Sequence, residues 1–168
     1  MEENPMREIR LEKVTINIGA GEAGPKLEKA KTLLEKIIGK KVVITKTKKR
    51  TTFGMAKGRP IGVKVTLRGK EAMEWLKRFL QANDNKLSAT QFDAGNFSFG
   101  VKEYVHIPGV RYIPEIGLLG MDVCVTLKRP GFRIKMRKIK KKKIGKRHMI
   151  TKEDTINWVK TNLGVRIV

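Results

Sequence analysis

The sequence predicts an α+β protein in which a mostly antiparallel sheet is covered by helices on one face and left open on the other. Two observations predict this class. Several short segments alternate apolar and polar residues, which is typical of strands that bury only one face. Longer segments repeat apolar residues at helical spacing, and the later strands follow one another in hairpin-like runs. This order favours a layered α+β fold over a doubly wound parallel sheet.

The expected strands follow from the alternation. The first covers 11–18 and places valine and isoleucine on one face and lysine, threonine and asparagine on the other. Comparable patterns predict the further strands 42–45, 61–68, 96–101, 104–107 and 121–128. The segment 106–120 contains several Pro and Gly residues, so we expect an irregular excursion before the last strand.

Three helices are expected between and after these strands. The first covers 25–38, with Pro suited to its first turn and Gly39 at its end, and the second covers 70–81. The last begins after Thr151, where an Asp three residues on completes a near capping box, and Gly164 ends it.

The length bounds the domain organisation. A chain of 168 residues and 19.1 kDa is the size of one domain that buries its own core. We therefore expect a single domain over 1–168 with a long basic loop at 46–60 and a basic C-terminal extension at 128–150. The polar N-terminus does not resemble a signal peptide and no apolar run is long enough to span a bilayer, so we expect a cytoplasmic protein.

Positive charge is concentrated in two segments. The formal net charge is +22, yet residues 36–70 hold 12 basic and no acidic residues, and residues 123–152 hold 13 basic and no acidic residues. A carboxylate in either segment would repel a phosphate, so their exclusion favours a nucleic acid as partner. An ordinary solvated surface, or the Lys- and Glu-rich surface of a heat-adapted protein, would intersperse the two signs.

The outward positions of three expected strands are small, hydroxylated or basic. Such a surface suits the phosphates and sugars of a nucleic acid, and the alternative interpretation is an ordinary solvated face. The positions are Lys13, Thr15, Asn17, Lys64, Thr66, Arg68, Cys124, Thr126 and Lys128.

One motif points elsewhere. Gly19–Gly24 reads G-x-G-x-x-G between an expected strand and an expected helix, the pattern of a dinucleotide site in an oxidoreductase. Two features count against this site. Glu22 would lie beside the pyrophosphate, and residues 36–70, where the acid that binds the ribose belongs, contain no Asp or Glu. We therefore prefer a glycine-rich turn between strand and helix.

Other candidate chemistry is sparse. His106 and His148 stand far apart with no ligand cluster, and the only cysteine, Cys124, has no adjacent base, so we expect no metal, no cofactor and no catalytic site. Phe97 and Phe99 are expected in the core rather than as base-stacking residues. Phe53 stands alone in a basic loop and is interpreted as a stacking anchor or, alternatively, as a plug that closes the loop onto the core.

The basic extension favours RNA over a membrane surface. A membrane-bound helix needs an apolar face, whereas Phe132, Ile134 and Met136 alternate with basic residues, which predicts extended chain. Extended basic arms that enter folded RNA account better for this segment.

Three segments closely resemble one known family. RLEKVTINIGAGEA (10–23), ITKTKKRTTFGMAKGRPIGVKVTLRG (44–69) and FDAGNFSFGVKEY (92–104) are similar to ribosomal protein L5, the universal large-subunit protein that binds 5S rRNA. The order and spacing run through nearly the whole chain. The stretch LKRPGFRIKMRKIKK (127–141) and the closing helix resemble the archaeal and eukaryotic branch.

The resemblance implies a five-stranded sheet whose open face holds 5S rRNA in the central protuberance. It also implies contacts with other large-subunit rRNA and proteins, with P-site tRNA and, through 108–119, with a small-subunit head protein. Asn17, Thr66, Arg68 and Phe53 match family positions, whereas Lys40 stands where Gln is common. The rRNA-binding residues expected are Lys13, Asn17, Lys40, Lys46, Lys48, Lys49, Arg50, Phe53, Lys64, Thr66 and Arg68. The loop expected near tRNA is Gly54, Met55, Ala56, Lys57 and Gly58. The extension contributes Arg129, Arg133, Lys135, Arg137, Lys140, Lys141, Lys142 and Lys143. A generic basic RNA-binding protein and the oxidoreductase are the alternatives.

Overall fold

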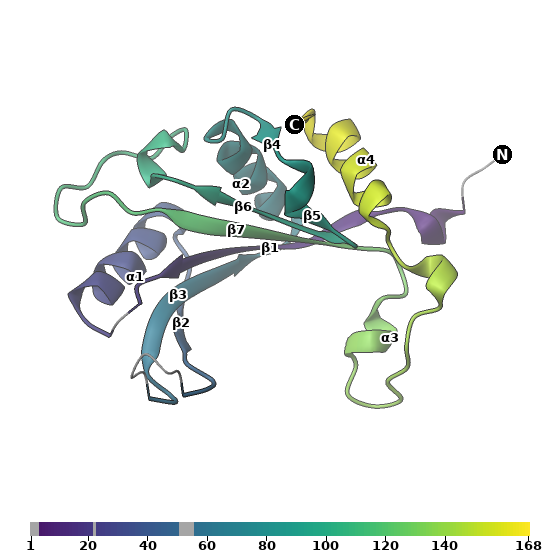
Figure 1. Ribbon diagram of the computed structural model, residues 1–168, viewed down its shortest axis with the longest axis horizontal. Coiled ribbons are helices and arrows are strands. Elements are labelled where there is room, and N and C mark those ends of the chain that lie inside the picture. Colours follow the sequence, from purple (N-terminus) through teal and green to yellow (C-terminus); the bar gives the residue numbers. More distant parts are fainter. Residues whose placement is uncertain (1–3, 22, 51–55) are drawn as a thin grey trace.

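Six strands form the main sheet in the order β2-β3-β1-β7-β6-β5, and every neighbouring pair is antiparallel. This computed structural model describes residues 4–21, 23–50 and 56–168 (Figure 1). The strands of the main sheet are β1 (Arg10–Gly19), β2 (Val43–Lys46), β3 (Pro60–Leu67), β5 (Phe92–Asp93), β6 (Asn96–Val101) and β7 (Met121–Lys128). The helices are α1 (Pro25–Ile38), α2 (Gly69–Gln81), α3 (Arg133–Met136) and α4 (Lys152–Leu163).

The predicted α+β class with one covered sheet face is confirmed, with one strand more than the resemblance implied. The extra strand, β5, is a two-residue edge that pairs with β6 across a tight turn. Gly95 in this turn has a φ of 76°, a left-handed conformation that favours glycine. A separate two-stranded parallel sheet, which the sequence pattern did not indicate, joins β4 (Lys86–Leu87) to β8 (Arg166–Ile167) near the C-terminus.

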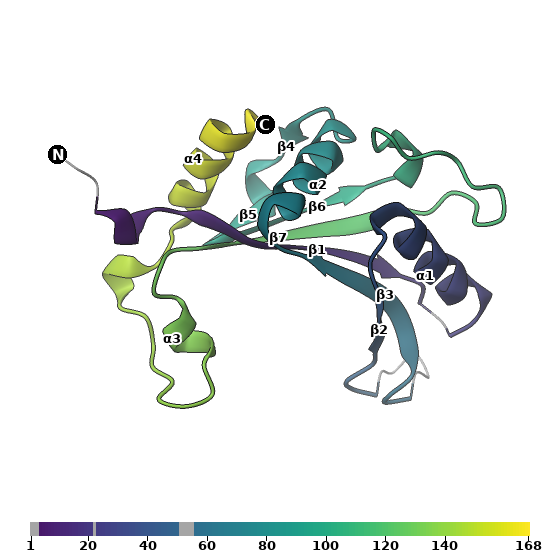
Figure 2. The same cartoon turned by 180° about the vertical axis from the view of Figure 1, so that it is seen from behind.

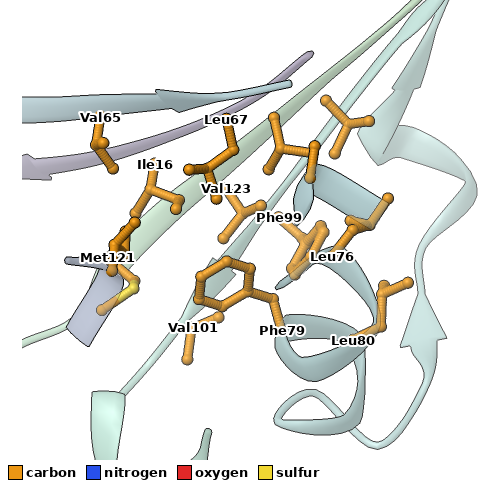
Figure 3. Packing of buried hydrophobic residues seen from close by; sticks show 14 of the residues in the cluster. Ile16, Val65, Leu67, Leu76, Phe79, Leu80, Phe99, Val101, Met121 and Val123 are labelled. Carbon is orange, nitrogen blue, oxygen red and sulfur yellow. The ribbon is translucent and has the colours of Figure 1, made fainter. Parts of the chain in front are cut away.

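The core lies between the sheet and the helices. Figure 3 shows Leu76 and Phe79 of α2 packed against Ile16, Val123 and Phe99 of the sheet. Phe97 and Phe99 are both buried, which confirms the prediction that they are core residues. Figures 1 and 2 show α2 and α4 on the same side of the sheet, and the buried side of α1 joins the same hydrophobic cluster.

Local signals explain the ends of the helices. Pro25 occupies the first turn of α1, and Gly39 ends that helix with a φ of 70°. The capping box expected before α4 is present, because Thr151 and Asp154 satisfy each other's backbone N–H groups. Thr155, one residue later, is fully buried, and its hydroxyl accepts the N–H of Gly95 at 3.0 Å, which fixes α4 to the β5–β6 turn.

Two expectations about local structure are wrong. Residues 104–107 were expected as a strand, but Tyr104–His106 form a 3-10 turn. The Tyr104 side chain is fully buried and its hydroxyl accepts the N–H of Ile113 at 2.9 Å, so the chain turns inward instead of continuing the ladder. Pro108, which has no N–H to donate to a sheet ladder, also disfavours a strand here. The excursion that follows is irregular, as predicted.

The segment expected to be extended at 132–137 instead contains the one-turn helix α3. Among its alternating apolar residues only Phe132 is buried, whereas Ile134 and Met136 are exposed. Within the residues that the structure describes, no strand pairs with this segment, and local bonds such as Arg137 N–H to the Arg133 carbonyl form instead. In the part of the chain that the structure describes, none of the helices combines the length and apolar character that crossing a bilayer requires.

Candidate nucleic-acid interface

The sheet face away from the helices, called here the open face, is built from cross-strand rows of polar residues. The register places Lys64 beside Asn17 and Asn17 beside Asp122 in one row. The next row runs from Thr66 through Thr15 and Cys124 to Ser98, and a third aligns Lys13, Thr126 and Asn96. Directly opposed side chains lie about 5 Å apart, so these rows form a continuous polar surface.

The positions predicted to face outward do so together. The side chains on the central strand are half-buried between their neighbours, whereas those on β3 and Cys124 on β7 are exposed. Partial burial raises the pKa of the Cys124 thiol above its usual range, and the carboxylate of Asp122 adds to this increase. The thiol is therefore mostly protonated at neutral pH, which does not suit a nucleophile.

Sequence reasoning missed Asp122 and the polar positions of β6 on this face. Asp122 stands between Asn17 and Gly100, so a carboxylate lies within the surface interpreted as phosphate-binding. The signal was present, because Asp122 shares the outward parity of Cys124. Asn96 and Ser98 likewise alternate with the buried phenylalanines of β6. A carboxylate accepts hydrogen bonds from base amino groups and ribose hydroxyls but repels phosphate, so Asp122 restricts which part of a nucleic acid can lie above it.

Two of the expected rRNA-binding cations are paired with acids. Lys40 directly follows the C-cap of α1 and forms an ion pair with Glu71 in the first turn of α2. The structure therefore places it beside the helices and not on the open face. Arg68 follows β3 as the N-cap residue of α2, and its guanidinium lies 3.7 Å from the carboxylate of the largely buried Glu12. Lys13 and Lys64 have no such partner within residues 4–21, 23–50 and 56–168.

One part of each acid-free segment projects from the sheet on the side opposite α2 and α4: the β2–β3 loop of the first and the extension around α3 of the second, at the two ends of the sheet. Figures 1 and 2 show the β2–β3 loop at one end and the segment around α3 at the other. The described part of the loop exposes Lys46, Lys48, Lys49, Arg50, Ala56, Lys57 and Gly58. Phe53, Gly54 and Met55 lie outside the described residues.

Thr47 fixes the base of the β2–β3 loop. Its backbone N–H donates to the Arg59 carbonyl at 2.9 Å, and its hydroxyl donates to the Ala56 carbonyl at 2.7 Å. The same hydroxyl accepts the N–H of Arg59 at 3.1 Å. The loop thus leaves the sheet as a closed hairpin, and its lysines project from an anchored stem.

Arg129 holds the neck of the C-terminal extension. Its guanidinium donates to the carboxylate of Asp154 and to the carbonyl of Met149, both at 3.0 Å. His148 adds a second link through a 2.8 Å hydrogen bond between its Nε2 and the Pro130 carbonyl. Arg129 is therefore a structural cation, unlike the other seven expected extension residues, which are exposed and lack acidic partners in the described chain.

Replacing Asp154 by Asn should make the melting temperature depend less on pH under acidic conditions. Burial opposes ionisation of Asp154, but hydrogen bonds with Thr151 and the charge of Arg129 outweigh it and hold the pKa below the ordinary 3.8. The ionised form stabilises the fold fully above the ordinary pKa, and this contribution disappears as the pH falls through the lower folded value. Melting temperatures between pH ~2 and ~5 should fall less for Asp154→Asn than for the unmodified protein.

Glu153→Gln provides the matched control for this measurement. Glu153 lies in the same first turn of α4 but is exposed and makes no ion pair in the described chain. Its curve should follow that of the unmodified protein. Parallel curves for all three proteins would show that Asp154 does not hold the neck.

Backbone N–H groups of the glycine-rich turn already form hydrogen bonds within the protein. The N–H groups of Ala20 and Gly21 both donate to the Ile61 carbonyl, at 2.9 and 3.1 Å, so they are not free to hold a pyrophosphate. β1, which precedes the turn, pairs with antiparallel neighbours on both sides, whereas a dinucleotide fold requires parallel strands.

Two family models match the chain. One is described as ribosomal protein L5 and matches residues 4–52, and the other, the ribosomal L5P family C-terminus, matches residues 60–158. The chain belongs to the ribosomal protein L5 family. The matches cover the strands of the open face and the whole extension, whereas Phe53 and all five residues of the loop expected near tRNA lie between them.

Archaeal members of the L5 family are similar over nearly the full chain. The large ribosomal subunit protein uL5 of Nanoarchaeum equitans is 51% identical over 168 residues, which cover 99% of each chain. That of Sulfurisphaera tokodaii is 54% identical over 168 residues, with 98% of this chain and 95% of the relative covered. That of Archaeoglobus fulgidus is 50% identical over 164 residues, with 97% and 92% covered.

Membership of the L5 family makes this chain a structural protein of the large ribosomal subunit, located on cytoplasmic ribosomes, and not an enzyme. The oxidoreductase alternative suggested by Gly19–Gly24 is therefore wrong. The G-x-G-x-x-G pattern arises because a strand that ends in glycine leads into a helix whose N-cap is Gly24.

Proposed function

We propose that this L5-family protein binds 5S rRNA with its open face and both basic segments, and helps to anchor it in the central protuberance beside other large-subunit rRNA and proteins. The observation that carries the proposal is the placement of two acid-free segments at opposite ends of one polar sheet face. Positive charge on one side of a flat surface matches a folded polyanion. Hydroxyl and amide groups on the open face, between the β2–β3 loop and the extension, suit ribose and phosphate.

The same proposal assigns the β2–β3 loop to P-site tRNA. The loop stem is fixed by Thr47, so Lys57 and Gly58 extend from a firm base. Gly58 has a φ of 89°, a turn conformation that favours glycine. Of the other residues expected near tRNA, Ala56 accepts the hydrogen bond from Thr47, and Gly54 and Met55 lie outside the described residues.

The excursion 108–119 is assigned to a small-subunit head protein across the subunit interface. The buried side chain of Ile107 just before it, its own buried Ile116, and the hydrogen bond between Tyr104 and Ile113 fix its base. Tyr112 and Leu118 remain 52% and 58% exposed. Exposed apolar side chains on an anchored segment suit contact with a protein surface better than contact with phosphate.

A salt titration tests the RNA assignment. If about eight phosphates are neutralised, a plot of log K against log salt for 5S rRNA should slope by about −6 to −7. Filter binding measures this slope. A slope near zero would contradict the proposal, and equal affinity for an unrelated RNA of the same length would favour the generic RNA-binding alternative.

Protection of Cys124 locates the bound RNA on the open face. Cys124 is the only cysteine and is exposed on that face, so alkylation reports on a single site. With 5S rRNA at about ten times its Kd, the free fraction and the alkylation rate should both fall about tenfold. The raised pKa of this thiol makes a mildly alkaline pH suitable for the assay.

The control moves the thiol to the helix side. A Cys124→Ser variant that also carries Ala89→Cys places the only cysteine in the exposed turn before β5. Its alkylation rate should not change when 5S rRNA is added. Equal protection of both thiols would show that the RNA does not select the open face.

A further inference from the structure

A cavity of about 330 Å³ lies where the C-terminal extension folds back over the end of the sheet. Its lining comes from three places: the β5–β6 turn, the C-terminal end of β7 and the extension. Asn96 and Thr126, which form a cross-strand pair on the open face, line it. The cavity is therefore continuous with the surface proposed to bind RNA.

The deeper walls are apolar and include an aromatic ring. Leu127, Ile150 and Phe132 line the cavity and are each less than 8% exposed. The Phe132 and His148 rings form an edge-to-face pair, with 5.7 Å between ring centroids and 72° between planes, which holds the Phe132 ring in place. A fixed aromatic ring beside aliphatic side chains suits a flat, apolar-faced group.

The rim carries positive charge. Lys135 and Lys143 both line the cavity and are exposed, and neither pairs with an acid in the described parts of the chain. The Lys135 ammonium lies 5.1 Å from the centroid of the Phe132 ring. Apolar walls under a cationic rim match a group that is flat and aromatic at one end and anionic at the other.

We infer that this cavity holds one extruded base of the bound RNA. A single nucleotide has the required chemistry: its base packs against Phe132, and the flanking phosphates reach Lys135 and Lys143. The volume lies at the lower end of the range for small-molecule pockets, about 300–1,000 Å³, which suits one base with its ribose. The inference rests on the proposed RNA-binding function and adds to it a site for a base outside the flat sheet.

Filling the cavity without changing charge tests this. Ala94 is exposed and lines the cavity, so Ala94→Trp should place an indole where the base would lie. We expect this variant of the full chain to bind 5S rRNA about 5- to 100-fold more weakly with an unchanged salt slope, because base stacking is lost and phosphate contacts remain. Ala89→Trp, also on an exposed alanine but outside the cavity, should bind as the unmodified protein does.

A second measurement identifies the base. 5S rRNA with bases removed at random is bound to each protein, and the bound fraction is mapped for missing bases. With the unmodified protein, RNA lacking one particular unpaired base should be depleted from the bound fraction, and Ala94→Trp should abolish that depletion. Unchanged affinity and unchanged depletion in Ala94→Trp would overturn the inference in favour of a protein side chain in the cavity. Failure of the unmodified protein to bind 5S rRNA would instead refute the proposed function.

Discussion

Replacing Lys13 and Lys64 together by glutamate should weaken binding to 5S rRNA by about 100-fold at physiological salt. The two lysines lie on neighbouring strands of the open face and have no acidic partners in the described chain, so their charge is available to phosphate. The double change removes two cations and adds two carboxylates to a surface that already contains Asp122. Each lost phosphate contact should also lower the salt slope by about 0.7 to 0.9, so the slope should fall by about 1.5.

The control reverses the same amount of charge on the helix side. Lys77 on α2 and Lys160 on α4 are exposed and make no ion pair in the described residues. Lys77→Glu with Lys160→Glu changes the net charge equally, and filter binding should detect only a small loss of affinity. Equal losses in both double variants would mean that total charge, rather than the open face, determines binding.

The sheet could be predicted from sequence because a strand that is buried on one face alternates apolar and polar residues. β7 buries every second residue, β1 does so between Val14 and Ile18 and β3 between Val63 and Leu67, and their outward residues meet in the rows that the pattern implied. The alternation also marked Asp122 as outward. Asp122 directly precedes the acid-free segment 123–152, so the charge pattern does not mark it as part of the RNA-binding surface, whereas the strand alternation does.

The parts that could not be predicted depend on contacts distant in sequence. Tyr104 lies in a segment with strand-like composition, yet its buried hydroxyl holds Ile113 and turns the chain inward. Arg129 is one of many basic residues in its segment, and only the fold brings it to Asp154. Charge counting treats such a structural arginine and an exposed lysine as equal, although only the exposed lysine is free to meet RNA.

Replacing Lys140, Lys141, Lys142 and Lys143 together by glutamine should also weaken 5S rRNA binding by about 100-fold, here by removing cations without adding carboxylates. These four lysines are exposed at the tip of the extension, and the backbone there is held by bonds from Lys142 N–H to the Ile134 carbonyl and from Arg137 to the Lys140 carbonyl. Glutamine keeps those backbone bonds and removes only charge. Loss of four phosphate contacts should lower the salt slope by about three.

The comparison of this variant with its control decides whether the extension is an RNA-binding arm or a solvated surface. Replacing Lys26, Lys29, Lys77 and Lys160 by glutamine removes the same charge from the helices. If the extension binds RNA, only the changes at 140–143 lower the salt slope. Melting temperatures remain equal, because neither set of lysines lies in the core or contacts Arg129. If both sets lower the slope equally, the extension adds only to a general attraction that any surface lysine provides.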